Sequence, residues 1–504
     1  MRLGRTLTTL ALAAATLGGC ATVDTKGPVI QAAEEMKAGP QNKPYRTITG
    51  FTPALQCMDN TMIVYGVRDL SLLVEDLVDA TKKVDAGTKD MLVSAVSAMS
   101  RRSRSIRLVT FGADAGNLAN FLFNAEQKGA YTEIPDYDIR GSISQFDDNL
   151  AKKQIDGALG ISRIGIGAAR SGSVSILGLD LTMISTKDFS VIPGVTANNQ
   201  VIIFKEGDGV DGEAEFNKWG INFSLTLTRN EGKAQALRNL VELAAIELVG
   251  KVSKTPYWKC LGADGSNPAI QKEVSDWFYT MAGDGSLYTY MQQQLRMRGY
   301  YNGPVDGGDH PTFMRAIVQY REVLGLSAEA KLDQEFLMAY LEADHVLLAA
   351  QFPPPKPIAA GYTSPLQIDV ISASGMQRFS PGDAVDIEVL TNRDAHVYCY
   401  LQDETAQVQR FYPNRFKRDS LLQAGHALEM PGDMKFRFVA NHKRVTETVA
   451  CFATEQDVMG KLPPVVAGSD FSPIRGITLD HVRTAYAKAA GGQIAEGFFH
   501  VSFR

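Results

Sequence analysis

The side chains that most often do chemistry in enzymes are scattered along this chain. None of its seven histidines lies at the spacing from a cysteine, serine or carboxylate that a metal site or an activated nucleophile uses. The glycines of residues 165–170 suggest a dinucleotide-binding loop, but that loop must be followed by a helix, and an extended segment follows here. The acidic loop 206–212 lacks the ordered oxygen ligands of a calcium site. We therefore predict no enzyme activity, no metal and no cofactor.

One cysteine has a predicted chemical role near the start of the chain. Two arginines precede an apolar run over residues 7–17, and Leu17-Gly18-Gly19 leads directly to Cys20. A basic start, an apolar middle and small residues at the end are typical of a secretory leader. With a cysteine at the cut, the segment resembles a bacterial lipoprotein signal, which implies acylation of Cys20, and Ala21 favours sorting to the outer membrane. An ordinary cleaved leader is the alternative.

The other cysteines predict two disulfides. They are few and widely spaced, and no Cys-x-x-Cys pair suits zinc. An exported protein meets an oxidising compartment, where disulfides form. Cys57 and Cys260 bound one predicted α/β unit, and Cys399 and Cys451 fall in two predicted strands of one domain. We predict the pairs Cys57–Cys260 and Cys399–Cys451.

Length and charge limit the class of protein. A chain of 504 residues accommodates roughly three to four domains. Its formal charge of -5 argues against a nucleic-acid partner, which requires a concentrated basic face. After the leader, no apolar run reaches the length of a transmembrane helix. Any membrane contact must therefore use a lipid or β-strands.

The first half of the chain alternates predicted strands and helices. The β-rich run 62–67 predicts a strand, and Thr88 caps a helix with apolar residues at helical spacing. Residues 106–111 and 138–143 predict two more strands. A helix over 237–248, apolar on one face, returns the chain to the same unit. These elements predict a compact α/β unit.

Residues 147–232 contain extended segments and no convincing helix. Apolar residues alternate with mostly polar ones in 177–184 and again in 221–228. Alternation over about 9–11 residues suits a transmembrane β-strand. An ordinary antiparallel sheet with one wet face gives the same pattern, and alternation alone favours it.

Several short motifs follow one another in a suggestive order. They are the Cys20 motif, Ile63-Val64-Tyr65-Gly66-Val67-Arg68-Asp69, Thr88-Lys89-Asp90-Met91-Leu92-Val93, Arg140-Gly141-Ser142-Ile143, the glycine-rich residues 160–167 and residues 236–242. In this order they resemble the CsgG/HfaB family of curli secretion channel lipoproteins. The resemblance covers roughly the first half of the chain, and no single motif is diagnostic alone.

The resemblance implies a shared β-barrel in a homo-oligomeric ring. Each subunit would contribute two hairpins, 147–183 and 195–229, because closure of a barrel removes strand edges that lipid cannot satisfy. The residues that would face lipid are Leu179, Leu181, Phe223 and Leu225.

The same resemblance places the pore constriction in residues 70–87. The candidates there are Leu72, Leu73, Glu75, Asp76 and Asp79. The segment has no aromatic residue and no asparagine, which family channels use, so a different cargo or an ungated ring would follow. A solvated charged loop or a short amphipathic helix is the alternative.

A small helical unit is predicted near residues 290–341. Its turn, Gly299-Tyr300-Tyr301-Asn302-Gly303-Pro304-Val305-Asp306-Gly307, is similar to that of peptidoglycan-binding-like three-helix domains, where glycines permit left-handed bends. The resemblance makes Tyr300, Tyr301 and Asp306 candidate peptidoglycan contacts. Packing of both tyrosines between helices is the alternative. The shifted Pro311-Thr312 cap and the Tyr320-Arg321 pair depart from the family pattern.

A proline-rich linker, stiff by composition, precedes the last domain. Short strands separated by turn signals then predict an all-β sandwich. It resembles an uncharacterised C-terminal domain of secreted and envelope proteins. Asn414 and Arg415 could anchor a partner, and a satisfied turn is the alternative.

These observations predict an α+β multidomain chain. Its predicted segments are a signal peptide (1–19), a lipidated tether (20–50), a CsgG-like domain (51–260), a peptidoglycan-binding-like helical domain (270–348), a linker (349–364) and a β-sandwich (365–504). The leading hypothesis is a lipid-anchored outer-membrane channel, facing the periplasm, that exports protein or polymer and is anchored toward peptidoglycan. The alternative is a periplasmic peptidoglycan-associated scaffold or activator lipoprotein without a pore. Presence of the strand-rich segment 147–232 favours the channel.

Overall fold

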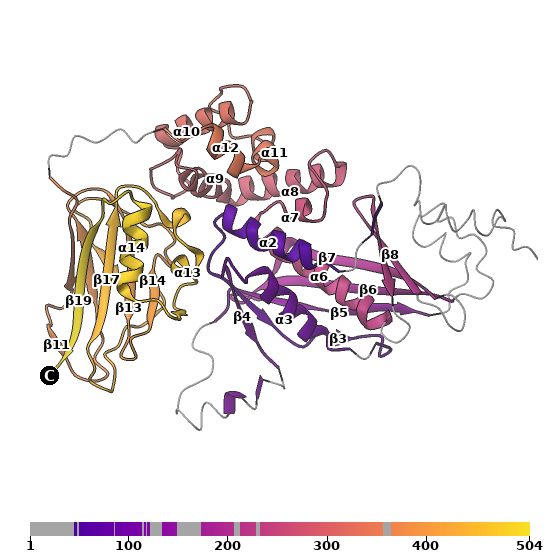
Figure 1. The fold of residues 1–504 in the computed structure, drawn as a ribbon, viewed down its shortest axis with the longest axis horizontal. Helices are drawn as coiled ribbons and strands as arrows, with labels where there is room; N and C mark the ends of the chain where they lie inside the picture. The colour runs from indigo at the N-terminus through magenta and orange to yellow at the C-terminus, as the bar shows by residue number, and fades with distance from the viewer. Residues whose placement is uncertain are drawn as a thin grey trace, which may run out of the picture.

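The computed structural model describes residues 45–47, 50–84, 86–112, 115–116, 118–120, 134–148, 173–205, 212–227, 232–355 and 364–504. It has an α/β unit, a helical unit and a β-rich C-terminal region (Figure 1). In the described ranges, no helix is long and apolar enough to cross a membrane. Cys20, the leader and the glycine-rich residues 160–167 lie outside these ranges.

A nine-stranded sheet organises the α/β unit, in the order β1-β9-β8-β7-β6-β5-β2-β4, with β3 paired to β5. The strands are β1 (Tyr45–Thr47), β2 (Leu70–Val74), β3 (Val78–Asp79), β4 (Ile106–Thr110), β5 (Tyr137–Asp147), β6 (Ser173–Ser185), β7 (Val191–Lys205), β8 (Gly212–Lys218) and β9 (Ile221–Leu227). The pairs β2–β4 and β2–β5 are parallel, and the pairs from β5 through β9 are antiparallel. Helices α2 (Thr52–Val64), α3 (Thr88–Met99) and α6 (Gly232–Ser253) cover one face of the sheet (Figure 1).

Most predicted elements of this unit are present, but the first predicted strand is wrong. Residues 62–64 end α2, and a turn follows. A proline in the first turn suits the start of that helix. Leu55, Met58 and Met62 are buried at helical spacing, so tertiary packing overrides the β-propensity of the last turn. The helices predicted at Thr88 and over 237–248 are α3 and α6, but the N-cap of α3 is Gly87 and Thr88 is its first helical residue.

In its described residues, the strand-rich segment forms an antiparallel sheet with one face covered by the unit's own core. Leu177, Leu179, Leu181 and Met183 of β6 are at most 2% exposed and belong to the core that includes α6. On the opposite face, side chains such as Asp180 are exposed. Alternation therefore separates a helix-covered face from a mixed face, on which Asp180 is exposed and Ile176 and Ile184 are buried.

The prediction that this apolar face contacts lipid is wrong for the side chains that the structure describes. Leu179, Leu181 and Phe223 are buried in the unit's own core, because α6 packs across β6, β7 and β9. The fourth predicted residue, Leu225, lies on β9 with its side chain outside the described part of the structure.

The helical unit comprises α7 (Tyr257–Cys260), α8 (Pro268–Asp284), α9 (Ser286–Met297), α10 (Pro311–Val323), α11 (Gln334–Glu342) and α12 (His345–Gln351). Its apolar core is continuous with that of the α/β unit, since one cluster of buried residues extends from Phe51 to Leu341. Cys57 and Cys260 form the predicted disulfide and tie α2 to α7. The two units thus share one core.

The C-terminal region is β-rich but not all-β. Its strands are β10 (Ile368–Ser372), β11 (Arg378–Phe379), β12 (Ile387–Thr391), β13 (Ala395–Gln402), β14 (Val408–Tyr412), β15 (Leu421–Leu422), β16 (Leu428–Met430), β17 (Glu447–Thr454), β18 (Pro473–Ile474) and β19 (Ala495–Phe503). It also contains η1 (Met459–Lys461), α13 (Pro464–Ala467) and α14 (Leu479–Ala489). The sheet β10-β12-β16 and a seven-stranded sheet enclose one core, and α13 and α14 cover a second core on the other face of the larger sheet.

The second predicted disulfide lies inside this region. Cys399 of β13 and Cys451 of β17 are directly paired in the larger sheet, with Cα atoms 4.1 Å apart. Both cores of the region are separate from the core of the first two units. The C-terminal region therefore has its own interior.

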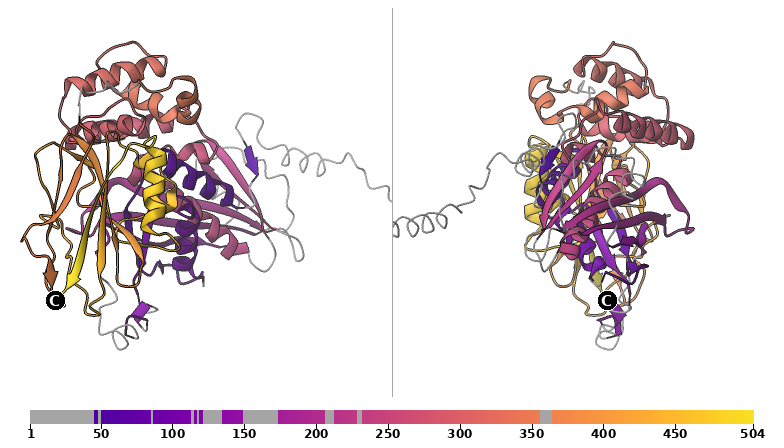
Figure 2. Two further views of the ribbon diagram at one scale, coloured as in Figure 1. Left: turned by 60° about the vertical axis from the view of Figure 1, so that its left-hand side comes forward. Right: turned by 90° about the vertical axis from the view of Figure 1, so that its right-hand side faces the viewer.

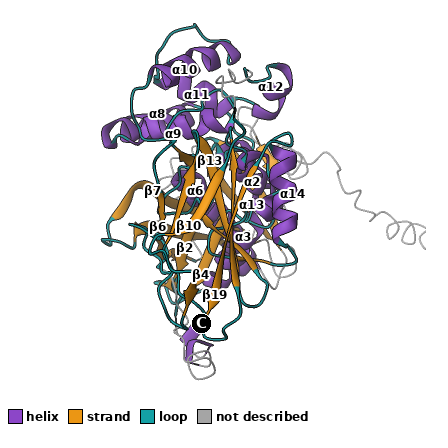
Figure 3. Cartoon of the chain, turned by 90° about the vertical axis from the view of Figure 1, so that its left-hand side faces the viewer, coloured by secondary structure: helices purple, strands orange, loops and turns teal. Residues whose placement is uncertain are grey.

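The C-terminal region and the α/β unit occupy opposite ends of the molecule (Figure 1). The C-terminal region lies at one end of the long axis and β8 at the other, with the helical unit alongside both units (Figure 1). Figure 2 shows β1, the short indigo arrow in its left view, on the side of the α/β unit remote from the C-terminal region. Viewed along the long axis, the helical unit lies above the strands of both other units (Figure 3).

Candidate functional site

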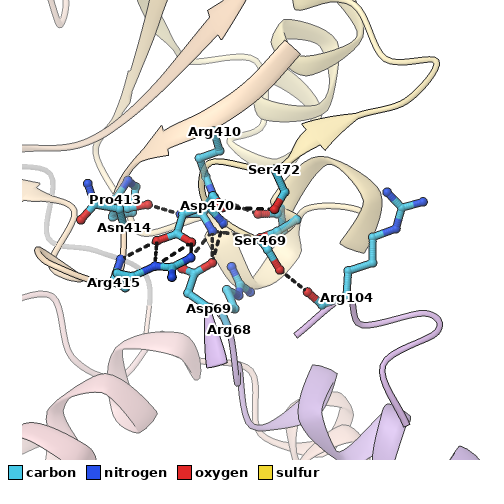
Figure 4. Close-up of polar contacts among 12 residues, drawn as sticks. Arg68, Asp69, Arg104, Arg410, Pro413, Asn414, Arg415, Ser469, Asp470 and Ser472 are labelled. Atoms are coloured by element: carbon cyan, nitrogen blue, oxygen red, sulfur yellow. Dashed lines mark hydrogen bonds and ion pairs between the residues drawn. The ribbon is translucent and has the colours of Figure 1, made fainter. Parts of the chain in front are cut away.

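Buried polar side chains gather where the C-terminal region meets the α/β unit. Arg68 and Asp69 lie between the end of α2 and the start of β2, and Asp69 has a positive φ of 54°. This backbone conformation is uncommon outside glycine, although aspartate tolerates it better than most residues. It brings the Asp69 carboxylate toward Arg410 and Asp470 of the C-terminal region (Figure 4).

The Asp69–Arg410 pair is the centre of this junction. Nη2 of Arg410 lies 2.8 and 3.0 Å from the two carboxylate oxygens of Asp69. The side chains are 1% and 8% exposed. The backbone N–H of Asp470 donates a third hydrogen bond to Asp69 at 2.7 Å. Burial acts to lower the pKa of Arg410, but attraction to Asp69, Tyr400 and Asp470 and the hydrogen bond to Asp69 together outweigh it, so the net shift is upward.

Arg410 is hydrogen-bonded on every side. Its guanidinium donates to the carbonyls of Ala467, Gly468 and Pro413 as well as to Asp69. A buried charge with this many partners is held in place, and loss of its counter-ion would leave it uncompensated. The junction is therefore stable only while both units contribute their charges.

A second ion pair supports the first within the C-terminal region. Arg415 and Asp470 have side chains 3% and 0% exposed, and their closest atoms are 2.5 Å apart. The side-chain carbonyl oxygen of Asn414 accepts hydrogen bonds from the backbone N–H groups of Phe416 and Lys417. Asn414 and Arg415 thus form a satisfied turn, as the alternative interpretation predicted (Figure 4).

Two further hydrogen bonds cross the same junction. Ser469 donates its hydroxyl to the carbonyl of Arg104 at 2.7 Å, and Arg68 donates Nη2 to the carbonyl of Met459 at 3.1 Å. Burial, and then repulsion from Arg410, lowers the pKa of Arg68. These contacts extend the junction toward the helical unit.

The C-terminal region also contacts the glycine-rich turn 299–307 of the helical unit. Asp419 accepts from Nη1 of Arg296 at 2.5 Å and from the backbone N–H of Val305 at 3.0 Å. Asn302 pairs its Oδ1 with Nε2 of His396 at 3.0 Å. The turn that suggested glycan binding is thus used as an intramolecular contact.

The structure places the predicted peptidoglycan residues apart from any open platform. Tyr301 is 3% exposed and donates its hydroxyl to the carbonyl of Pro304. Tyr300 is half-buried, and its ring lies against Tyr320. The Asp306 carboxylate is exposed and faces His310 at 2.9 Å. Packing of the two tyrosines, the alternative interpretation, is what the structure contains.

The predicted constriction residues do not form one surface. Leu72 and Leu73 belong to β2, and Leu72 is fully buried, so the expectation of a loop at this point is wrong. Parallel pairing with β4 and β5 extends these residues as a central strand. Beyond the strand, Glu75, Asp76 and Asp79 take separate partners, which are Arg140, Lys89 and the backbone of residues 81 and 84.

Where the C-terminal region contacts the helical unit, one trio links serine, histidine and asparagine as a catalytic triad does, with the two ring nitrogens exchanged. Ser420 Oγ lies 2.9 Å from His396 Nδ1, and Asn302 faces the other ring nitrogen. Ser420 is 3% exposed and His396 is fully buried, so a substrate has no access. Burial also lowers the pKa of His396 from 6.5 to about 4, which makes it a weak base. The trio therefore acts as a structural contact.

A narrow crevice lies beside the junction. It is lined by residues of both units, including Gly66, Arg68, Ser105 and Gly460. Its volume of about 20 Å³ holds about one water molecule. Arg68 Nη1 and Ser105 Oγ have no hydrogen-bond partner within the described structure, and such a water would satisfy them. In the residues that the structure describes, no cluster of His, Cys, Asp or Glu could hold a metal ion.

Comparison with known proteins bears only on the C-terminal region. A family model described as a domain of unknown function, DUF4384, matches residues 378–457. That segment contains Arg410 and Arg415 but ends before Asp470. No curated protein matches the chain. The C-terminal region is thus similar to a domain family whose description names no activity.

Proposed function

We propose that this chain is a lipid-anchored scaffold of the bacterial outer membrane, facing the periplasm. Acylated Cys20 anchors the α/β unit through the tether, and the junction holds the C-terminal region at the other end of the molecule. The C-terminal region would then present a binding surface at a fixed distance from the membrane. The proposal requires no enzyme activity and no pore.

The buried Asp69–Arg410 junction carries this proposal. A flexible appendage would need no ion pair with exposed fractions of 1% and 8% across its boundary. The cores on the two sides are separate, so the C-terminal region is docked as a preformed body. The tether leads to β1, which lies on the far side of the α/β unit (Figure 2).

The burial of the strand faces favours this scaffold over a secretion channel. The channel hypothesis assigned the apolar faces of β6 and β9 to lipid, and α6 covers those faces. The side chains left exposed on the other face are polar, as at Arg140, Asp180 and Asn198. A polar face is costly in contact with hydrocarbon.

The test compares attachment with conduction in the same protein. In cells, we expect the wild type to incorporate labelled palmitate and to fractionate with outer membranes, and Cys20→Ser to lose both properties. In planar bilayers, we expect the purified lipidated protein to give no conductance. Discrete conductance steps that vanish in Leu181→Arg would overturn the scaffold and restore the channel.

A second arm tests the cell wall as a partner. Purified peptidoglycan sacculi are incubated with the wild type and with Arg410→Ala, which frees the C-terminal region from Asp69. We expect neither protein to sediment, because the turn 299–307 is occupied and its tyrosines are packed. Binding by the variant alone would identify the helical unit as a hidden glycan-binding module.

A further inference from the structure

Met297, the last residue of α9, lies between the backbones of two other units. A Cβ built on Gly66 of the α/β unit would lie 2.5 Å from Met297 Sδ, and Gly66 has a positive φ of 63°. A Cβ built on Gly460 of the C-terminal region would lie 3.1 Å from Met297 Cγ. A Cβ at Gly66 would overlap the thioether sulfur, and a Cβ at Gly460 would press closely on the same side chain. The Met297 side chain therefore packs tightly against the backbones of the α/β unit and the C-terminal region.

Met297 is also only half-buried as a residue. The chain has 16 methionines, and among those in the described residues only Met297, Met314, Met338 and Met376 are half-buried, the others being buried. Gly66 and Gly460, which flank Met297, both line the water-sized crevice. Of these four half-buried methionines, Met297 is the one whose side chain packs against both glycines.

We propose that Met297 is a redox modification site whose oxidation by peroxide releases the C-terminal region. The inference rests on the proposed scaffold function and adds a means of regulating it. The Met297 sulfur attacks one oxygen of hydrogen peroxide, the O–O bond breaks and an S–O bond forms. Sulfur loses two electrons, peroxide is reduced, and the second oxygen leaves with two protons as water. The product is methionine sulfoxide.

The contacts around Sδ explain why this product does not fit. Sulfoxidation adds an oxygen to an atom that already lies too close to Gly66 for a Cβ. It also converts an apolar group into a polar one, and a buried polar group without a partner is destabilising. Each unit keeps its own apolar core when the junction next to Met297 opens, because the cores belong to different units. Opening at this boundary is therefore the easiest relaxation.

The experiment uses the full mature chain, purified in detergent and treated with hydrogen peroxide. Peptide mass spectrometry measures oxygen added at each methionine, and small-angle scattering, with the detergent contrast-matched, measures the radius of gyration. We expect the radius to increase in step with oxidation of Met297, and methionine sulfoxide reductase to reverse the change. Met297→Leu should keep the compact radius under peroxide, whereas the matched control Met314→Leu should open as the wild type does.

Three results would overturn the proposal. They are an unchanged radius when Met297 is fully oxidised, opening of Met297→Leu by peroxide, and opening that follows oxidation of another methionine. Tryptophan fluorescence checks that Met297→Leu is folded, and reductase reversal in the wild type decides the matter if it is not. The measurement uses purified protein, so failure of membrane attachment in cells would refute the scaffold and leave this result standing.

Discussion

The helical unit and the C-terminal region are joined to the α/β unit by opposite means. The helical unit shares a continuous apolar core with it and is further tied by the Cys57–Cys260 disulfide. The C-terminal region has separate cores and meets it through the Asp69–Arg410 ion pair and the hydrogen bonds around that pair. An apolar boundary costs free energy in proportion to the area exposed when it opens. A polar boundary exchanges its hydrogen bonds for water, so it can be specific and still reversible.

The largest effect is expected from a charge in the shared core. Leu181→Arg places an unpaired cation at a position that is 2% exposed, which should cost roughly 3–5 kcal/mol of the free energy of unfolding. Denaturant unfolding followed by tryptophan fluorescence measures this effect, because Trp219, Trp258 and Trp277, the three tryptophans of the chain, lie in the first two units. Asp180→Arg on the exposed face of the same strand is the matched control, and we expect it to unfold like the wild type. Equal effects at both positions would contradict the assignment of faces.

Breaking the polar boundary should be severe but local. Asp69→Asn leaves Arg410 buried without its counter-ion. We expect this to weaken the association of the C-terminal region with the α/β unit by roughly 3–5 kcal/mol. We expect calorimetry to show two separated transitions in place of a coupled one, with the tryptophan-reported transition little changed. The exposed pair Arg483–Glu496 supplies the control, since Glu496→Gln should cost only about 0–1 kcal/mol. A single transition in Asp69→Asn would show that other contacts hold the C-terminal region.

The disulfides sharpen the comparison because each lies on one side of the boundary. Cys57→Ser with Cys260→Ser removes a cross-link over a sequence separation of 203, and we expect a loss of about 2–5 kcal/mol. Tryptophan-detected unfolding should register this change. Cys399→Ser with Cys451→Ser should instead lower only the transition of the C-terminal region. A thiol titration that finds all four cysteines free in the mature protein would refute both pairs.

Acid should weaken both boundaries by a smaller amount. Burial lowers the pKa of His396, at the polar boundary, from 6.5 to about 4. The folded state thus binds fewer protons than the unfolded state in this range, and stability is lost as the pH falls from about 6.5 toward 4. Asp457 and Asp419 favour the charged ring, and Arg296 opposes it. Calorimetry between pH 7 and pH 5 should show that stability depends less on pH in His396→Gln than in the wild type. An unchanged pH dependence would exclude His396 as its source.

His345 supplies the matching test in the shared core. Burial lowers its pKa from 6.5 to about 2, so the same direction of pH dependence is expected. It lies between Tyr320 and Tyr340 inside the helical unit. The pH dependence of unfolding detected by tryptophan fluorescence should change in His345→Gln and stay as in the wild type in His396→Gln. Reversed assignments would mean that the two boundaries are coupled.

Local patterns were enough to predict much of the fold. The helical spacing after Thr88 and over 237–248 predicted α3 and α6, and the β-rich run 138–143 predicted β5. These predictions succeed because an amphipathic pattern needs only one buried face, whatever covers it. The run 62–67 failed for the opposite reason. Its β-branched and aromatic residues favour a strand, and the core contacts of Met58 and Met62 place it at the end of α2.

The sequence by itself determined the periodicities, the cysteine pairs and the turn at residues 299–307, because each depends on neighbours or on a very small set of partners. Only the tertiary structure decided whether solvent, lipid or another part of the chain covers each face of a strand or helix. The alternating pattern of β6 would be the same whether lipid or α6 covered its apolar face. In the structure, α6 covers that face. No local sequence pattern could predict the junction, because Asp69 and Arg410 are separated by 341 residues. Nothing in the sequence around either residue indicates which residue it pairs with. A buried ion pair exists only once folding has removed both groups from water.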